Sequence, residues 1–405
     1  MRNKIYTGAS NKKSLYDIST PEEWNNKVII FIHGYMSYKD WGCWNFVSDF
    51  FTKNNYAFLK YNISHNGGTL SQPVDFNDLE SFAENNYMKE IQDFEAIVRV
   101  VDSEFKSNPE IYVIGHSRGG GIALLHSDFG RIEKIASWAG ISNISDRFPK
   151  GDMLNQWKKD GVYFRENGRT KQKMPHNYSQ YENFLRYKDR LNIENYCKNS
   201  TKPTLIIHGE NDQSVLIKEG ETIAEWLQTD LVRIPNTEHT FGTKQPYPQL
   251  DMPFALKQTC EATLIFFNQP TINKQLKEKL SILSELIQLS KSDDKIEEIE
   301  MSFLRAISIQ LGVKEEQLGK LLDNPSVFSP NKSEMDRIVQ FQRMILMMNI
   351  DLEQSSKEVE FIKNAGVKLG LPHEAVNEVL KRMKTRGHSA MLPDELISIF
   401  KTFHN

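Results

Sequence analysis

The chain has 405 residues, of which 39% are hydrophobic and 25% are charged; this composition is typical of a globular protein and excludes a largely disordered chain. Its formal net charge is −3 and no apolar run has membrane-spanning length, so we expect neither nucleic acid nor a membrane as a partner. The three cysteines lie far apart without forming a disulfide framework, and no apolar leader segment is found, so we expect a cytoplasmic protein.

Short β-branched runs alternate with amphipathic segments from about residue 27 to residue 268. Several runs are apolar throughout, as in strands that are covered on both faces. The alternation predicts an α/β fold with a mostly parallel sheet and helices on both of its faces. The expected strands are residues 27–34, 56–63, 111–117, 134–140, 204–209 and 231–236. The expected helices are residues 43–54, 86–105, 119–127 and 218–228.

An insertion at about residues 141–200 interrupts this alternation and shows no strand pattern of its own. A segment of this length in a compact domain is usually a lid or a binding element. Residues 150–175 hold seven lysines and arginines against three acids. A lid with this charge would favour an anionic substrate, which Lys171 and Lys173 would bind; the alternative is a solvated charged surface.

The last third of the chain shows only helical patterning. Apolar residues recur there at helical spacing, and no strand-like run follows about residue 275. We therefore expect an α/β domain at residues 1–270 and a separate all-helical domain at residues 271–405. The apolar positions expected to face the helical core are Leu276, Leu280, Leu283, Ile287, Phe303, Leu304, Ile307, Leu311, Ile338, Phe341, Ile345 and Met348.

The stretch "IYVIGHSRGGGIAL" places Ser117 between two glycines where an expected strand ends and an expected helix begins. A sharp turn at this point would lift the serine hydroxyl out of the sheet, where a base can reach it. The alternative is a tight turn that happens to contain a serine. The rest of the chain must therefore supply the base and its acid.

Two further residues follow expected strands. Asp212 lies after the strand at 204–209 and His239 after the strand at 231–236. The carboxyl ends of parallel strands meet at one edge of a sheet, so these side chains should lie beside Ser117. Ser117, His239 and Asp212 would then serve as nucleophile, base and orienting acid, with Glu210 as the alternative acid.

Three motifs carry these residues in chain order: "GHSRGG", "HGENDQSV" and "NTEHTFG". In this order, each after a strand, they resemble the α/β-hydrolase superfamily over residues 25–268. The stretches "KDWGCWNF" and "YNISHNGGT" resemble its branch of dienelactone hydrolases and prolyl-oligopeptidase-type peptidases.

The resemblance also implies where the substrate oxygen would be stabilised. In this superfamily two backbone N–H groups form an oxyanion hole, one after the nucleophile and one in the loop after an early strand. These positions are Arg118 and Tyr35, with Met36 as the alternative to Tyr35. His65 and Asn66 follow another strand and would either bind substrate or only shape their loop.

Two segments of the helical part share an acidic pattern. Asp293 and Glu300 are seven residues apart, and Asp351 and Glu358 repeat this pair 58 residues later. The aspartates would either cap the helices that follow or join the glutamates in a site for a hard cation. The repeat resembles the tellurite-resistance TerB-like helical domain over about residues 275–385, and this resemblance implies binding of a divalent cation such as Ca²⁺ or Mg²⁺.

Together these features predict a serine hydrolase that needs no cofactor for catalysis. Its substrate would be a small-molecule ester or thioester, with an amide or peptide as the alternative, and the reaction would pass through an acyl-enzyme. The helical domain would bind a protein partner or another copy of the chain. The competing hypothesis is a stress-response interaction or scaffold protein in which the hydrolase fold mainly binds and the helical tail docks partners or metal.

Overall fold

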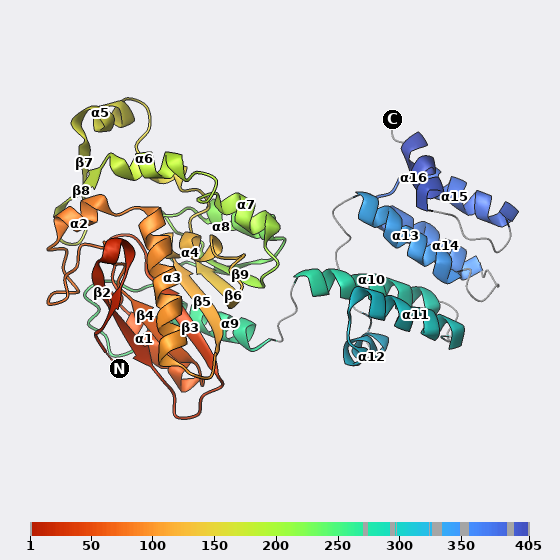
Figure 1. The fold of residues 1–405 in the computed structure, drawn as a ribbon, viewed down its shortest axis with the longest axis horizontal. Helices are drawn as coiled ribbons and strands as arrows, with labels where there is room; N and C mark the ends of the chain where they lie inside the picture. The colour runs from red at the N-terminus through yellow and green to blue at the C-terminus, as the bar shows by residue number, and fades with distance from the viewer. Residues whose placement is uncertain are drawn as a thin grey trace. The chain divides into compact units, whose positions relative to one another are not determined.

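The computed structural model describes residues 2–269, 274–291, 296, 298–323, 325, 334–348, 356–386 and 393–403. The chain divides into two compact units, Met1–Thr271 and Ile272–Asn405, which Figure 1 draws in red to green and in green to blue. No helix within the described ranges is long and apolar enough to cross a membrane.

The first unit is built on an eight-stranded sheet with the strand order β1-β2-β4-β3-β5-β6-β9-β10. The β1–β2 and β2–β4 pairs are antiparallel, and all other neighbouring strands are parallel. The predicted α/β class and its six parallel strands are confirmed, whereas β1 and β2 were not predicted. The strands are β1 (Lys4–Thr7), β2 (Lys13–Ser19), β3 (Lys27–Ile32), β4 (Ala57–Tyr61), β5 (Glu110–His116), β6 (Ile132–Trp138), β9 (Thr204–Gly209) and β10 (Leu231–Ile234).

Helices cover both faces of this sheet, which explains why its central strands are apolar throughout. Along β3, Val28 and Ile30 pack in one core with α3, α4 and α8. Ile29 and Phe31 point to the opposite face and pack in a second core with α1 and α9. The helices of this unit outside the lid are α1 (Trp44–Lys53), α2 (Leu79–Glu84), α3 (Tyr87–Glu104), α4 (Arg118–Leu124), α8 (Ile217–Leu227) and α9 (Phe254–Asn268).

The lid at residues 141–200 contains a two-stranded antiparallel sheet, so the prediction that it has no strand is wrong. Each strand has five residues with largely exposed or half-buried side chains, and Pro175 lies in one of them, so neither forms a buried apolar run. Trp157 is buried inside the lid, and its indole N–H donates to the carbonyl oxygen of His176 at 2.8 Å. Figure 1 shows α5, α6 and the hairpin together at one end of the unit. The lid elements are α5 (Asp152–Asp160), β7 (Val162–Glu166), β8 (Lys173–Asn177), α6 (Ser179–Arg186) and α7 (Ile193–Asn199).

The described part of the second unit consists of helices, as the sequence predicts. Its own apolar core includes Leu280, Leu283, Ile287, Leu304, Ile307, Ile338, Phe341 and Ile345, all at predicted core positions. Leu276, Phe303 and Leu311 pack half-buried against this core, and the side chain of Met348 lies outside the described residues. The helices are α10 (Lys274–Ser290), α11 (Glu298–Leu311), α12 (Glu315–Asp323), α13 (Glu334–Met348), α14 (Ser356–Lys368), α15 (His373–Arg386) and α16 (Pro393–Thr402).

Candidate active site

Ser117 occupies a strained turn between β5 and α4. Its backbone has φ 58° and ψ −120°, a conformation that costs a non-glycine residue about 1–3 kcal/mol. The flanking glycines are needed because the backbones pack too closely for side chains. A Cβ on Gly119 would lie 2.3 Å from the carbonyl oxygen of Ile32, and one on Gly115 would lie 2.2 Å from that of Gly119. The glycine–serine–glycine spacing therefore has a steric cause at this turn.

The structure brings the three predicted catalytic residues into one hydrogen-bonded chain. Ser117 Oγ lies 2.9 Å from His239 Nε2, and His239 Nδ1 lies 2.7 Å from Asp212 Oδ2. These distances lie within the range expected for a nucleophile, its base and an orienting acid. Ser117 is held in place by its backbone N–H, which donates to the carbonyl oxygen of Trp138 at 2.8 Å. The arrangement can deprotonate the serine hydroxyl as it attacks an electrophile.

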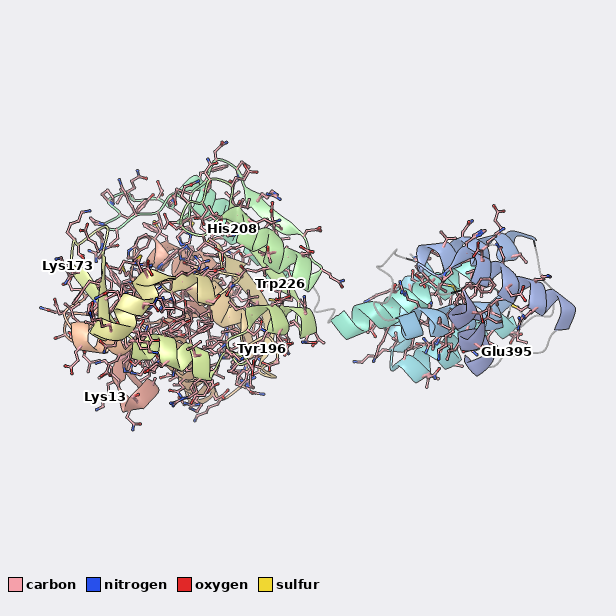
Figure 2. The ribbon with its side chains drawn as sticks, turned by 90° about the horizontal axis from the view of Figure 1, so that it is seen from above. Lys13, Lys173, Tyr196, His208, Trp226 and Glu395 are labelled. Carbon is pink, nitrogen blue, oxygen red and sulfur yellow. The ribbon has the colours of Figure 1, made fainter. Side chains whose placement is uncertain are left out.

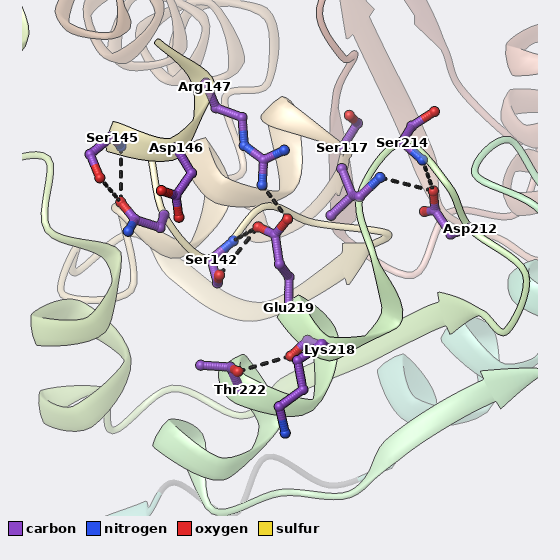
Figure 3. A network of polar contacts seen from close by, with 12 residues as sticks. Ser117, Ser142, Ser145, Asp146, Arg147, Asp212, Ser214, Lys218, Glu219 and Thr222 are labelled. Atoms are coloured by element: carbon purple, nitrogen blue, oxygen red, sulfur yellow. Dashed lines mark hydrogen bonds and ion pairs between the residues drawn. The ribbon is translucent and has the colours of Figure 1, made fainter. Parts of the chain in front are cut away.

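Asp212 is buried at the end of β9, and its second oxygen is also bonded. Oδ1 accepts the backbone N–H groups of Ser214 at 2.8 Å and Val215 at 2.9 Å, a turn that Figure 3 shows beside Ser117. Burial raises the pKa of Asp212, but hydrogen bonds from His208 and His239 outweigh burial and hold this pKa well below its usual range. Asp212 is therefore an anion at neutral pH. The alternative acid, Glu210, has an exposed side chain.

His208 is a second imidazole on the same carboxylate, and the sequence did not predict this role. Its Nε2 lies 2.8 Å from the carbonyl oxygen of Val215 and 3.2 Å from Asp212 Oδ2. Because a carbonyl oxygen only accepts hydrogen bonds, Nε2 carries the proton and directs it toward both oxygens. His208 lies fully buried in the first unit, where Figure 2 labels it. The sequence signal was only a histidine four residues before Asp212, inside an apolar strand.

His116 supports the loop that carries the base. Its Nε2 lies 3.0 Å from the carbonyl oxygen of His239, and the centroids of the two rings are 4.9 Å apart. Burial lowers the pKa of His116 to about 3, so this ring is neutral and donates its proton to the carbonyl group. The contact orients His239 without offering a competing base to Ser117.

The loop after β3 runs directly past the nucleophile. A Cβ on Gly34 would lie 3.0 Å from the Cβ of Ser117, so the backbone that follows Gly34 lies beside the reacting hydroxyl. Neither the N–H of Tyr35 nor that of Arg118 donates a hydrogen bond to another described residue. Their assignment to the oxyanion hole stays a prediction, and the structure leaves both groups available for it.

A pocket lies between this loop, the nucleophile turn and the lid. Its free space, including the part open to solvent, is about 360 Å³. About 10 Å³ of this space is open to the centre of a water-sized sphere, so the pocket is narrow. The side chains that give it its character are Tyr35, Tyr87, Arg118, Arg147, Arg165 and His176. Arg165 was predicted only as one of the basic residues of the lid, and no role was predicted for Arg147.

Four residues predicted to bind substrate do not line this pocket. His65 is buried and its Nδ1 lies 2.8 Å from Ser64 Oγ. The side-chain oxygen of Asn66 accepts the N–H of Gly68 at 3.0 Å, so these two residues shape their own loop. Lys171 is exposed and lies 3.3 Å from Glu166, and Lys173 is also exposed, at the outer edge of the unit in Figure 2.

The metal site predicted for the helical unit falls largely on residues outside the described part. Asp293 and Asp351 lie outside it, as does the side chain of Glu358. Glu300 is buried in α11. Among the described residues no group of three or more histidine, cysteine, aspartate or glutamate side chains could hold a metal ion.

The sheet order, the two covered faces and the nucleophile turn define an α/β-hydrolase fold. Residues 16–227 match the protein family described as BD-FAE, and the chain belongs to this family. No curated protein matches the chain.

Solved structures with this fold include a soluble variant of monoglyceride lipase from Saccharomyces cerevisiae in complex with a substrate analog. It is 14% identical, with a TM-score of 0.50 over 66% of this chain and 96% of that one. Est1E from Butyrivibrio proteoclasticus, with ferulic acid bound, is 17% identical, with a TM-score of 0.49 over 65% of this chain and 98% of that one. At 14% identity the likeness to the lipase concerns the fold alone.

Proposed function

We propose that the chain is a serine hydrolase that cleaves an ester or thioester bond. The observation that carries this proposal is the chain of contacts from Ser117 Oγ through both nitrogens of His239 to Asp212. The strained turn at Ser117 supports it, because such strain is typical of functional sites. The buried free cysteines Cys43, Cys197 and Cys260 agree with a place in the cytoplasm.

In the first half-reaction, Ser117 Oγ attacks the carbonyl carbon of the substrate while its proton moves to His239 Nε2. The carboxylate of Asp212 keeps the other ring proton on Nδ1 and stabilises the imidazolium that forms. The N–H groups of Tyr35 and Arg118 bind the oxygen that becomes negative. When the carbon–oxygen or carbon–sulfur bond breaks, His239 gives its proton to the leaving group and the acyl group stays on Ser117.

In the second half-reaction, water repeats the attack with His239 as its base. The acid is released and the proton returns to Ser117 Oγ. Alkoxides and thiolates leave more readily than amines, so we place esters and thioesters before amides and peptides as substrates.

Steady-state hydrolysis of a neutral 4-nitrophenyl ester tests this function. The wild-type chain should release 4-nitrophenol, and Ser117→Ala should lower kcat by several orders of magnitude. Ser214→Ala is the matched control, because its side chain is exposed and only its backbone N–H contacts Asp212. Equal turnover by wild type and Ser117→Ala would overturn the proposal, as would an equal loss in Ser214→Ala.

For the second unit we propose a TerB-like domain that serves assembly or regulation. The duplicated acidic pattern and the helical core of its own support this assignment. Removal of residues 272–405 should then change the oligomeric state or the regulation of turnover while the triad remains complete. Size-exclusion chromatography and the ester assay, run on both lengths of the chain, measure these effects; no change in either would contradict the role.

A further inference from the structure

The pocket between the loop after β3, Arg118 and the lid carries an excess of positive charge. Arg118, Arg147 and Arg165 line it, and none of its described lining residues is an aspartate or glutamate. Two of the arginines are countered from outside the lining: Arg118 contacts Glu90 at 3.0 Å, and Arg147 pairs with Glu219. Arg165, on the lid strand β7, is exposed; its guanidinium lies 5.9 Å from the ring centroid of Tyr35, and it makes no ion pair with any described residue. Among the described residues, therefore, one positive charge of the pocket has no acidic counter-charge.

The two paired arginines are fixed before any ligand arrives. The guanidinium of Arg118 lies 4.5 Å from the ring centroid of Tyr35 and 4.6 Å from that of Tyr87, so it is stacked between two aromatic rings. The carboxylate that holds Arg147 also accepts the backbone N–H of Ser142 at 2.9 Å, as Figure 3 shows. Groups held in this way lose little conformational freedom when a ligand binds.

The other polar groups of the pocket are neutral and include an unused donor. Burial lowers the pKa of His176 to about 4, and its Nε2 lies 2.7 Å from the hydroxyl oxygen of Tyr35. The Tyr87 side chain is buried, and its hydroxyl group has no hydrogen-bond partner within the described part of the chain. A buried hydroxyl without a partner is costly, so this group is a strained feature of the pocket wall.

The position of the pocket indicates which part of a substrate enters it. Tyr35 and Arg118 line it and also carry the N–H groups assigned to the substrate oxygen. The described lining includes neither Ser117 nor any residue from the loop of His239. Because His239 must reach the leaving group to give it a proton, the leaving group lies on the side of that loop. The acyl part therefore extends into the pocket of arginines.

We propose that the acyl group of the substrate ends in a carboxylate, so that the preferred substrate is a monoester of a dicarboxylic acid. This proposal rests on the proposed serine hydrolase function. One carboxylate matches the single uncompensated charge of Arg165, and its oxygens suit the planar donors of a guanidinium. The ester carbon–oxygen bond breaks, the alcohol leaves with the proton from His239, and water releases the dicarboxylic acid from Ser117.

Two chromogenic esters with six-carbon acyl chains test the proposal. The 4-nitrophenyl monoester of adipic acid carries the terminal carboxylate, and 4-nitrophenyl hexanoate lacks it. We expect kcat/KM to be at least about tenfold higher for the adipate ester. Arg165→Gln should lower the ratio of the two kcat/KM values about tenfold, and Arg165→Lys should restore part of it.

Lys159→Gln is the matched control, since it removes one positive charge from an exposed position of α5 that does not line the pocket. It should leave the ratio unchanged. A ratio of one or less in the wild-type chain would overturn the carboxylate pocket, and so would an equal fall of the ratio in Lys159→Gln and Arg165→Gln. Hydrolysis of the hexanoate ester in either case would still support the hydrolase function.

A binding measurement keeps the proposal testable even if neither ester is hydrolysed. Calorimetric titration of Ser117→Ala measures its affinity for adipate and for hexanoate. The two acids differ only at one end of the chain, where adipate has a second carboxylate and hexanoate has a methyl group. Adipate should bind at least about tenfold more tightly, and Ser117→Ala combined with Arg165→Gln should lose this preference. Equal affinity for the two acids would contradict the pocket independently of catalysis.

Discussion

At the scale of single residues, the site depends on a carboxylate that remains charged although it is buried. Asp212 accepts two backbone N–H groups and lies within contact of two imidazoles. These donors outweigh the cost of burial, and the resulting anion keeps the proton of His239 on Nδ1, so that Nε2 can face Ser117. The reactivity of Ser117 thus depends on Asp212, which acts on it through His239.

Asp212→Asn tests this dependence. The side-chain amide would offer a donor where the carboxylate accepts, so His239 would adopt the wrong tautomer. We expect kcat to fall by about 10³- to 10⁴-fold with little change in KM. Circular dichroism checks that the fold is retained, and near-normal kcat in a folded variant would show that Asp212 does not orient the base.

His208→Phe tests the second imidazole as a positioning residue. The ring volume remains, but the proton directed at Asp212 Oδ2 is removed, so the pKa of Asp212 should rise and its carboxylate should be held less firmly against His239. We expect a loss in kcat of about tenfold, smaller than that of Asp212→Asn. His208→Gln, which keeps a donor, should recover part of the loss. A kcat equal to that of wild type in His208→Phe would assign His208 a packing role only.

At the scale of elements, the strand–turn–helix unit β5–Ser117–α4 is positioned by close backbone contact. α4 approaches β3 so closely that Gly119 has no room for a side chain. Gly119→Ala should push the helix away from β3 and lower the free energy of unfolding by about 1–3 kcal/mol, with loss of turnover. Gly130→Ala is the control, because nothing lies within 4 Å of the added Cβ. Urea unfolding compares the two; equal stability would refute the steric account.

Prediction from the sequence succeeded for elements whose residues carry a local signal. Several of the parallel strands are near-continuous apolar runs because both sheet faces are covered. The motif residues Ser117, Asp212 and His239 follow strands that end at one edge. The hairpin β7–β8 escaped prediction because its strands are short, hold few buried side chains and include Pro175. Arg147 and Arg165 escaped it because the pocket joins their lid segment to Tyr35 and Arg118, which are distant in sequence, and no spacing reveals this.

At the scale of the whole molecule, buried histidines should make the first unit sensitive to acid. Burial lowers the pKa of five of them to about 3 or about 4, below the ordinary value of 6.5. As the pH falls below 6.5 the unfolded chain binds protons that the folded chain does not, so stability present above that pH is lost toward about pH 4. Burial raises the pKa of Asp93 to about 6. This single group has the opposite effect on the stability at low pH. The histidines are His33, His65, His116, His126 and His176.

Urea unfolding at pH 7 and pH 5, followed by tryptophan fluorescence, measures this effect, since all six tryptophans lie in the first unit. Stability should be lower at pH 5 by roughly 1 kcal/mol or more for each histidine. His126→Leu should weaken the pH dependence by about one proton, because His126 is buried against Phe94. Stability that is unchanged or higher at pH 5 would contradict the assignment.

The most direct test of the whole account is labelling by a fluorophosphonate, which reacts with a serine only when a base activates it. Intact mass spectrometry should show one adduct per chain, and peptide mapping should place it on Ser117. The adduct should be absent in Ser117→Ala and form far more slowly in His239→Ala, while Ser214→Ala should label like wild type. A chain that remains unlabelled, or carries its adduct on another residue, would contradict the claim that Ser117 is the nucleophile.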